Sequence, residues 1–176
     1  MRKIRPSEIL DASEMMRLRE VVDASCLRGM RDAAMIELLV STGMRVTELI
    51  DLRVTDVLFD EMVVLVNGRD GRDVPLNSRA YSVLDKYIEA VEPQGFLFVS
   101  FNKGNNKQKQ LTRQGTWKII KQYGEAAGIQ KAISPEVIRN SFAVHYLKNG
   151  GDIQVLQGIL GHMEVSSTLV YKNVRI

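Results

Sequence analysis

A change of hydrophobic periodicity in the middle of the chain sets the fold class. Between Val54 and Leu76 the apolar residues come in short alternating runs, which is typical of β-strands, and the segment 67–71 between two of these runs is rich in Asn, Asp and Gly. Such a segment predicts a hairpin turn. On both sides of this block, apolar residues recur every three to four positions, which is typical of amphipathic helices. The sequence therefore predicts an α+β fold, mostly helical, with a small antiparallel three-stranded sheet.

Residues that favour helix ends mark the boundaries of the predicted helices. Gly43 should end a strongly apolar helix, because glycine readily adopts the left-handed conformation found at helix C-termini. Ser13 is expected to cap the first helix. Ser166 or Ser167 is expected to cap the last helix, which would carry Tyr171.

Length and composition limit the class of protein. The 176 residues are enough for one domain with a full core. The chain has no apolar run long enough to span a membrane, and residues 1–30 lack the apolar stretch of a signal peptide. The single cysteine, Cys26, cannot form an internal disulfide. We therefore expect a cytoplasmic protein with no membrane partner.

The net charge of +3 hides an uneven distribution. Residues 1–100 hold 13 basic and 17 acidic side chains, a balance of −4, whereas residues 101–131 hold seven basic and one acidic side chain, a balance of +6. Such a cluster indicates a site for a polyanion, although a solvated loop and helix face would explain it equally well. Segment 102–110 has few apolar residues and is predicted to be a mobile loop. The basic residues expected to bind are Lys103, Lys107, Lys109, Arg113, Lys118 and Lys121.

Two arginines, a late histidine and a near-terminal tyrosine follow one another as Arg45, Arg139, His162 and Tyr171. A tyrosine can attack a phosphodiester if positive charge neutralises the pentacoordinate phosphate as it forms. Arginine suits this task because its planar fork donates two parallel hydrogen bonds and does not lose its charge. The set therefore indicates phosphoryl transfer to tyrosine.

Each of these residues also has a structural explanation when it is considered alone. Arg45 could pair with Glu48 on its own helix, and Arg139 could lie on the surface and reach the glutamate three positions earlier. The histidine and the tyrosine could pack in the core. The order of all four residues favours the functional interpretation.

Four blocks of the chain resemble the catalytic domain of tyrosine recombinases of the phage-integrase and Xer type. The last block is the most specific, because it holds Leu160-Gly161-His162 and Tyr171. The resemblance implies the tyrosine-recombinase catalytic fold, with residues 1–176 as a single catalytic domain without the N-terminal DNA-clamping domain usual in the family. The blocks are Thr42–Leu49, Asn67–Leu76, Ile133–Leu147 and Leu156–Tyr171.

The resemblance also implies a reaction and its participants. The reaction is site-specific cleavage and rejoining of double-stranded DNA through a 3′-phosphotyrosine link, as in DNA integration and recombination, without metal or cofactor and by protomers assembled on DNA. Arg45 and Arg139 would clamp the scissile phosphate, His162 would hydrogen-bond to it, and Tyr171 would be the nucleophile.

Two positions depart from the family pattern. Arg69 stands on the hairpin turn where a lysine usually protonates the leaving 5′-oxygen, and arginine is a poor proton donor near neutral pH, although it can stabilise the developing charge. Glu136 stands where a histidine is usual. It would either accept the proton of Tyr171 as a general base or simply form a favourable acidic first turn after Ser134-Pro135. These departures leave two alternatives open, namely a catalytically impaired DNA-binding module and a type IB topoisomerase-like activity.

Overall fold

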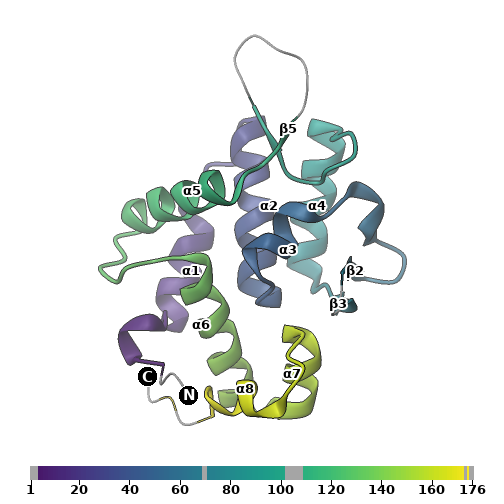
Figure 1. Ribbon diagram of the computed structural model, residues 1–176. Helices are drawn as coiled ribbons and strands as arrows, with labels where there is room; N and C mark the ends of the chain where they lie inside the picture. Colours follow the sequence, from purple (N-terminus) through teal and green to yellow (C-terminus); the bar gives the residue numbers. More distant parts are fainter. Residues whose placement is uncertain (1–3, 69–70, 102–108, 173, 175–176) are drawn as a thin grey trace.

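The computed structural model describes residues 4–68, 71–101, 109–172 and 174. Its central element is α2 (Leu27–Thr42), which is buried along most of its length because apolar residues occupy nearly all of its faces. Figure 1 shows α2 in the middle of the helical body. The helices that pack most extensively on it are α1 (Ala12–Glu20), α3 (Val46–Asp51), α4 (Ser78–Val91) and α6 (Pro135–Lys148).

The predicted three-stranded antiparallel sheet is confirmed. Strand β2 (Val63–Val66) lies between β1 (Val57–Leu58) and β3 (Arg72–Pro75). The register pairs Val66 with Arg72, so an arginine stands on the same face of β3 as the buried Val74. The predictions of an α+β class and of a mainly helical chain are therefore confirmed.

A second, two-stranded sheet was not predicted. It pairs β4 (Val99–Ser100) with β5 (Lys109–Gln110), so the end of the predicted loop 102–110 is a strand. Residues 102–108 lie outside the described residues. Strand β5 consists of two polar residues and β4 ends a continuous apolar run, so neither strand shows the alternation that would have indicated it.

The predicted helix ends are right in some places and wrong in others. Gly43 ends α2 in the left-handed conformation (φ 62°), as expected. Ser13 does not cap α1, because Asp11 accepts the N–H of Glu14 instead. The last helix, α8 (Val165–Leu169), follows Glu164 and has no serine cap, and Tyr171 lies beyond its end rather than within it.

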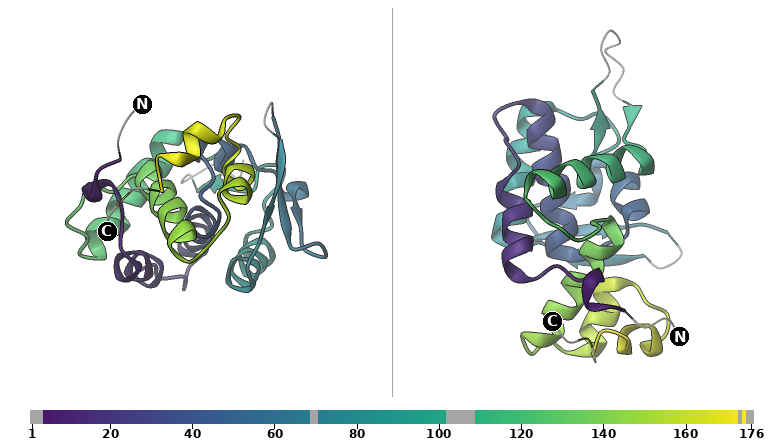
Figure 2. Two further views of the ribbon diagram at one scale, coloured as in Figure 1. Left: turned by 90° about the horizontal axis from the view of Figure 1, so that it is seen from below. Right: turned by 90° about the vertical axis from the view of Figure 1, so that its left-hand side faces the viewer.

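The described residues form two hydrophobic clusters, and the smaller one holds Tyr171. It is built from the segment before α1, α6, α7 (Ile153–Leu160) and the chain around α8. Figure 2 shows these C-terminal helices together at one end of the molecule. The larger cluster fills the space among α1–α4, α5 (Arg113–Ala126) and both sheets. Short 3-10 turns at Pro6–Glu8 and Val54–Asp56 complete the described elements.

In the part of the chain that the structure describes, no helix combines the length and the apolar character that crossing a membrane requires.

Candidate active site

The C-terminal end of α7 gathers three arginines from other parts of the fold. The helix ends at Gly161 (φ 63°), and the backbone N–H groups of Gly161 and His162 bond to the carbonyls of residues 158 and 157. A helix C-terminus leaves carbonyls unpaired and carries partial negative charge, which cations stabilise. The next three carbonyls accept hydrogen bonds from arginine side chains: Ile159 O from Arg72 Nε (2.6 Å), Leu160 O from Arg139 Nη2 (2.8 Å) and Gly161 O from Arg45 Nη2 (3.3 Å).

Arg139 is fixed between the ends of two helices. It lies on α6, is only 3% exposed, and donates from Nη1 to the carbonyl of Gly43 (2.8 Å) as well as from Nη2 to Leu160. The alternative in which Arg139 lies on the surface is therefore wrong. A buried guanidinium with five N–H donors can hold these carbonyls and still offer donors to a ligand.

Glu48 joins Arg45 to Arg72. It accepts the backbone N–H of Arg45 (2.6 Å) and the Arg45 Nη1 (3.0 Å), so the predicted pair within one helix is present. Both Glu48 oxygens also accept from Arg72 (2.9 and 3.0 Å). Burial alone would raise the pKa of Glu48, but the hydrogen bonds and charges of the two arginines outweigh it and lower the pKa. Glu48 is therefore a carboxylate held between two cations.

His162 is held as a neutral ring. Its Nε2 lies 3.0 Å from Arg139 Nη2, and because a guanidinium only donates, this nitrogen must be the acceptor. The proton is thereby assigned to Nδ1, which donates to Thr168 Oγ1 (2.9 Å). Burial, followed by the charges of Arg139 and Arg45, lowers the pKa of His162 to about 4.

Tyr171 lies beside this ring. It is 5% exposed, its ring stacks on His162 with centroids 6.3 Å apart and planes 9° apart, and its Oη donates to Asn140 Oδ1 (3.3 Å). Burial raises the pKa of Tyr171, the charge of Arg139 opposes this shift, and the charge of Glu136 adds to it. The tyrosine is therefore protonated, and its hydroxyl is buried against Asn140.

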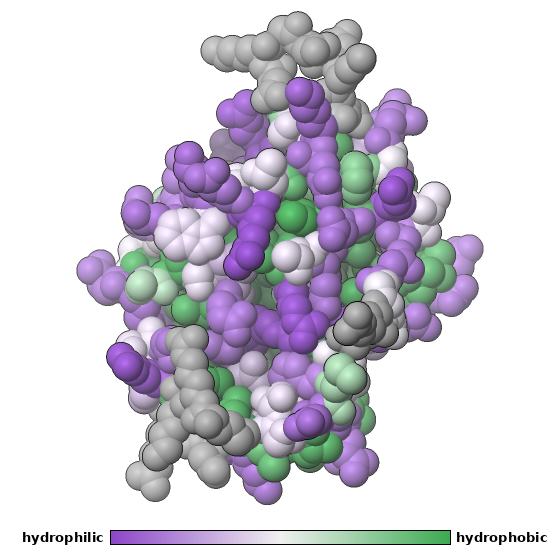
Figure 3. Space-filling model, in the orientation of Figure 1, coloured by the Kyte–Doolittle hydropathy of each residue, from purple (hydrophilic) through white to green (hydrophobic). Residues whose placement is uncertain are grey.

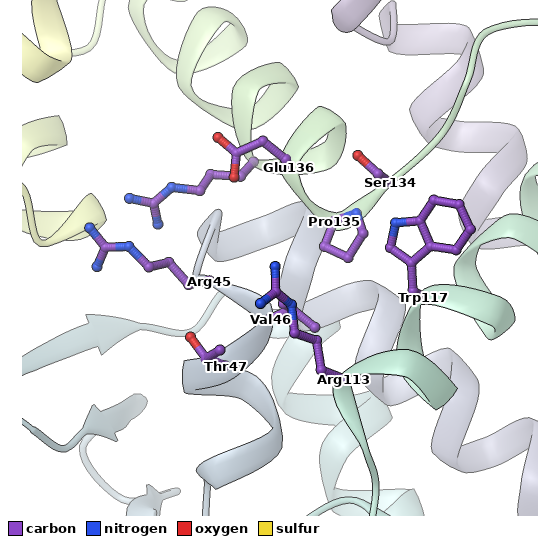
Figure 4. Close-up of a pocket in the computed structure, with 9 residues that line it drawn as sticks. Arg45, Val46, Thr47, Arg113, Trp117, Ser134, Pro135 and Glu136 are labelled. Carbon is purple, nitrogen blue, oxygen red and sulfur yellow. The ribbon is translucent and has the colours of Figure 1, made fainter.

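A cleft of about 340 Å³ opens in front of the two arginines. Figure 4 shows Arg45, Arg113 and Glu136 around it, with Trp117 on the side of α5. Glu136 is exposed in the first turn of α6, and among the described residues no ion pair involves its carboxylate. Figure 3 shows hydrophilic side chains gathered across the middle of this face. The cleft can therefore receive an anion, and Glu136 is the acidic group at its edge.

One of the predicted polyanion-binding residues, Arg113, reaches the cleft from α5. Arg113 lies in the first turn of this helix and lines the cleft, and Lys118 and Lys121 are exposed on the same helix. Lys121 also lies 3.8 Å from Glu125. Lys109 is exposed on β5. The other predicted residues, Arg69, Lys103 and Lys107, lie outside the described residues.

Sequence reasoning missed Arg72 as a site residue. The signal was the alternation of the strand: Arg72 lies on the same face as Val74 and Leu76, which are two and four residues later and buried. A charged residue on a buried face needs a partner. It also missed Thr168 as the partner of His162 and Asn140 as the partner of Tyr171, for which no local pattern exists. Within the described ranges, no group of three or more His, Cys, Asp or Glu side chains could hold a metal ion.

The fold is that of a tyrosine-recombinase catalytic domain. The structure is similar to the XerA recombinase, with a TM-score of 0.85 at 32% identity over 95% of this chain and 59% of that chain. It also has the fold of a λ integrase dimer subunit bound to a COC′ core site, with a TM-score of 0.76 at 20% identity over 99% of this chain and 62% of that one.

The chain belongs to the phage integrase family, whose model matches residues 8–176. It is 42% identical over 176 residues to the tyrosine recombinase XerD of Staphylococcus epidermidis. This alignment covers 95% of the present chain and 58% of the relative. The XerD of Listeria monocytogenes is 36% identical over 177 residues, with the same coverage. The chain thus spans 58% of the length of these relatives.

Proposed function

We propose that this chain cleaves and rejoins double-stranded DNA at specific sites through a covalent bond between Tyr171 and a 3′-phosphate. The observation that carries the proposal is the gathering of Arg45, Arg139, His162 and Tyr171, which are separated by up to 126 positions in the sequence. Arg45 and Arg139 line the cleft, His162 accepts a hydrogen bond from Arg139, and Tyr171 stacks on His162. Singly these residues have structural explanations, but a common anion-binding cleft beside a tyrosine suits phosphoryl transfer.

In the proposed reaction the two arginines act on the phosphate. Arg45 and Arg139 line the cleft and would neutralise the non-bridging oxygens as the pentacoordinate phosphate forms. Tyr171 Oη forms a bond to phosphorus while the bond from phosphorus to the 5′-oxygen breaks, which frees a 5′-hydroxyl. The tyrosine must first leave Asn140. Its proton passes to a base, and the leaving 5′-oxygen takes up a proton to become the hydroxyl, so the step gains and loses no proton overall. Attack by a 5′-hydroxyl on the phosphotyrosine reverses the step and needs no external energy source.

The groups that handle protons remain predictions. His162 Nε2 accepts from Arg139 and Nδ1 donates to Thr168, so the predicted hydrogen bond from His162 to a phosphate would require a proton on Nε2. Glu136 raises the pKa of Tyr171 and so opposes its ionisation, whereas in the predicted general-base role it would accept the Tyr171 proton. Arg69 would support the leaving 5′-oxygen.

The proposed partners are DNA and further copies of a recombinase. Arg113, Lys118 and Lys121 extend the positive charge of the cleft along α5 and would contact phosphates beside the cleavage site. A cytoplasmic location agrees with a DNA substrate and with the single cysteine. The cleavage reaction on both strands would need other protomers assembled on the same DNA. Residues 1–176 would act as the catalytic domain.

A suicide substrate tests the proposal without knowledge of the target sequence. A pool of labelled duplexes with random arms, nicked so that the cleaved fragment diffuses away, is incubated with the chain, and protein–DNA adducts stable to detergent are captured and sequenced. We expect an adduct that Tyr171→Phe abolishes. The matched control is Tyr146→Phe, a tyrosine on α6 that is partly buried against the same cluster, and it should leave the adduct unchanged.

The other outcomes separate the alternatives. Salt-sensitive DNA binding without any adduct would refute the proposed reaction and favour the impaired DNA-binding module. Relaxation of supercoiled plasmid without exchange of strands between molecules would favour the topoisomerase-like activity.

A further inference from the structure

Arg72 takes no part in the proposed phosphate chemistry, yet it is buried next to the groups that do. Its side chain is 9% exposed, and it makes a two-pronged contact with Glu48 and a third hydrogen bond to Ile159 O. The planar fork of arginine matches a carboxylate in this way, whereas lysine offers a single point charge. Arg72 therefore connects β3 to α3 and to the last turn of α7.

Glu48 is shared by two guanidinium groups that compete for it. Its Oε1 accepts from both Arg72 Nη1 (2.9 Å) and Arg45 Nη1 (3.0 Å). Arg72 also occupies Oε2, together with the backbone N–H of Arg45. Because both oxygens are occupied, Arg45 donates one side-chain hydrogen bond to Glu48, and its side chain remains 39% exposed at the cleft.

Removal of Arg72 would change how Glu48 holds Arg45. A partly buried carboxylate that loses one of two cations binds the remaining cation more strongly, and the best geometry left is a two-pronged contact with Arg45. That contact would draw Arg45 away from Gly161 O and from the cleft.

We propose that Arg72 is a positioning residue. By occupying the Glu48 carboxylate and bonding to the last turn of α7, it keeps the guanidinium group of Arg45 turned toward the phosphate. The inference rests on the proposed phosphate-binding role of Arg45. Gly161 makes the arrangement possible, since a Cβ at this position would lie 2.7 Å from Arg72 Nη1.

Chemical modification tests this arrangement without DNA. Phenylglyoxal reacts with accessible arginines, and mass spectrometry gives the rate at each position. In Arg72→Met, Arg45 should react at least about threefold more slowly, because Glu48 now pairs with it through both oxygens. Arg113, exposed in the same cleft, is the internal control and should keep its rate. If Arg72 only held the fold together, its loss would loosen the site and Arg45 would react faster.

Repeating the Arg72→Met comparison in a Glu48→Gln variant tests whether the charge of the Glu48 carboxylate is responsible. Glu48→Gln keeps an acceptor for Arg45 but removes the charge, so adding Arg72→Met to it should change the Arg45 rate little. The matched control is Arg19→Met, which removes another arginine that pairs with a buried glutamate, Glu37, on α2. Equal slowing in both Glu48 backgrounds, or no slowing in Arg72→Met, would overturn the inference. Should Arg72→Met fail to fold, Arg72→Lys serves the same test, because lysine leaves one carboxylate oxygen to Arg45.

Cleavage provides an independent readout. On the DNA recovered with the suicide substrate, Arg72→Met should slow single-turnover cleavage of the phosphodiester by about 100-fold. It should slow cleavage of the matching methylphosphonate much less, since that substrate has no charge on the replaced oxygen for Arg45 to neutralise. Equal losses on both substrates would contradict a role through Arg45. If the unmodified chain forms no adduct with either substrate, the proposed function fails, and the modification rates still decide the role of Arg72.

Discussion

His162 should stay neutral in the folded chain down to about pH 4. The cause is burial, followed by the charges of Arg139 and Arg45, and the hydrogen bond from Arg139 to Nε2 favours the same neutral ring. In the unfolded chain the residue titrates near its ordinary pKa of about 6.5. Between these two values the unfolded chain binds more protons than the folded one. The contribution of His162 to the free energy of unfolding is therefore complete above about pH 6.5 and is lost as the pH falls toward 4.

The size of this contribution follows from the shift. A fall in pKa from 6.5 to about 4 corresponds to about 3 kcal/mol if it is converted directly. The ring is only half buried, so solvent screening reduces the expected value to about 1–2 kcal/mol. Between pH 7.5 and pH 5, the unmodified chain should lose about 1 kcal/mol more stability than His162→Gln.

Two measurements check this prediction. The chain contains two histidines, so the ring proton resonances of both can be followed by NMR, with His162→Gln for assignment. His145, which lies 2.8 Å from Leu10 O through Nε2, is the internal comparison. Urea unfolding of both proteins at the two pH values gives the stability difference. A His162 midpoint at or above pH 6.5 would refute the reasoning, because Arg139 could not then be donating to Nε2.

Three further predictions concern the cleft and its surroundings. Glu136→Gln should speed single-turnover cleavage by about threefold to tenfold, because it removes a charge that raises the pKa of Tyr171 and repels phosphate. A loss of cleavage would instead support the general-base role. Gly161→Ala should lower the free energy of unfolding by about 1–3 kcal/mol in urea denaturation, because it combines a left-handed conformation with a contact to Arg72, and an unchanged midpoint would contradict this. Lys118→Ala should reduce the slope of log affinity for DNA against log salt by about one, whereas an unchanged slope would mean that this lysine is only solvated.

The main features of the fold could be predicted because they depend on local patterns. Alternation identified the strands around the 67–71 turn, and glycine identified the end of α2. Tyr171 was placed in a helix because nothing local shows that α8 ends at Leu169. The position of the tyrosine is instead fixed by packing in the second cluster, against residues that lie far away in the sequence.

The candidate site could be predicted only in part. The order of its four main residues identified the site, but no sequence pattern indicated which groups these residues contact. Arg72 meets Glu48 across 24 positions and Ile159 across 87, and Arg139 meets the carbonyl of Gly43 across 96. Two of these partners are backbone carbonyls, which every residue type possesses. No residue pattern could therefore indicate that they hold an arginine.

The arginines at the end of α7 have a consequence for how the site tolerates change. Their supports are main-chain carbonyls of Ile159, Leu160 and Gly161, so the side chains at 159 and 160 do not themselves accept the hydrogen bonds of the arginines. Side-chain mutagenesis at these two apolar positions would therefore not detect the contribution of their carbonyl groups. Replacing the peptide groups themselves, for example by ester bonds that make the carbonyl oxygen a weaker acceptor, would expose the contribution. A side-chain exchange at Ile159 can thus leave the acceptors of all three arginines in place.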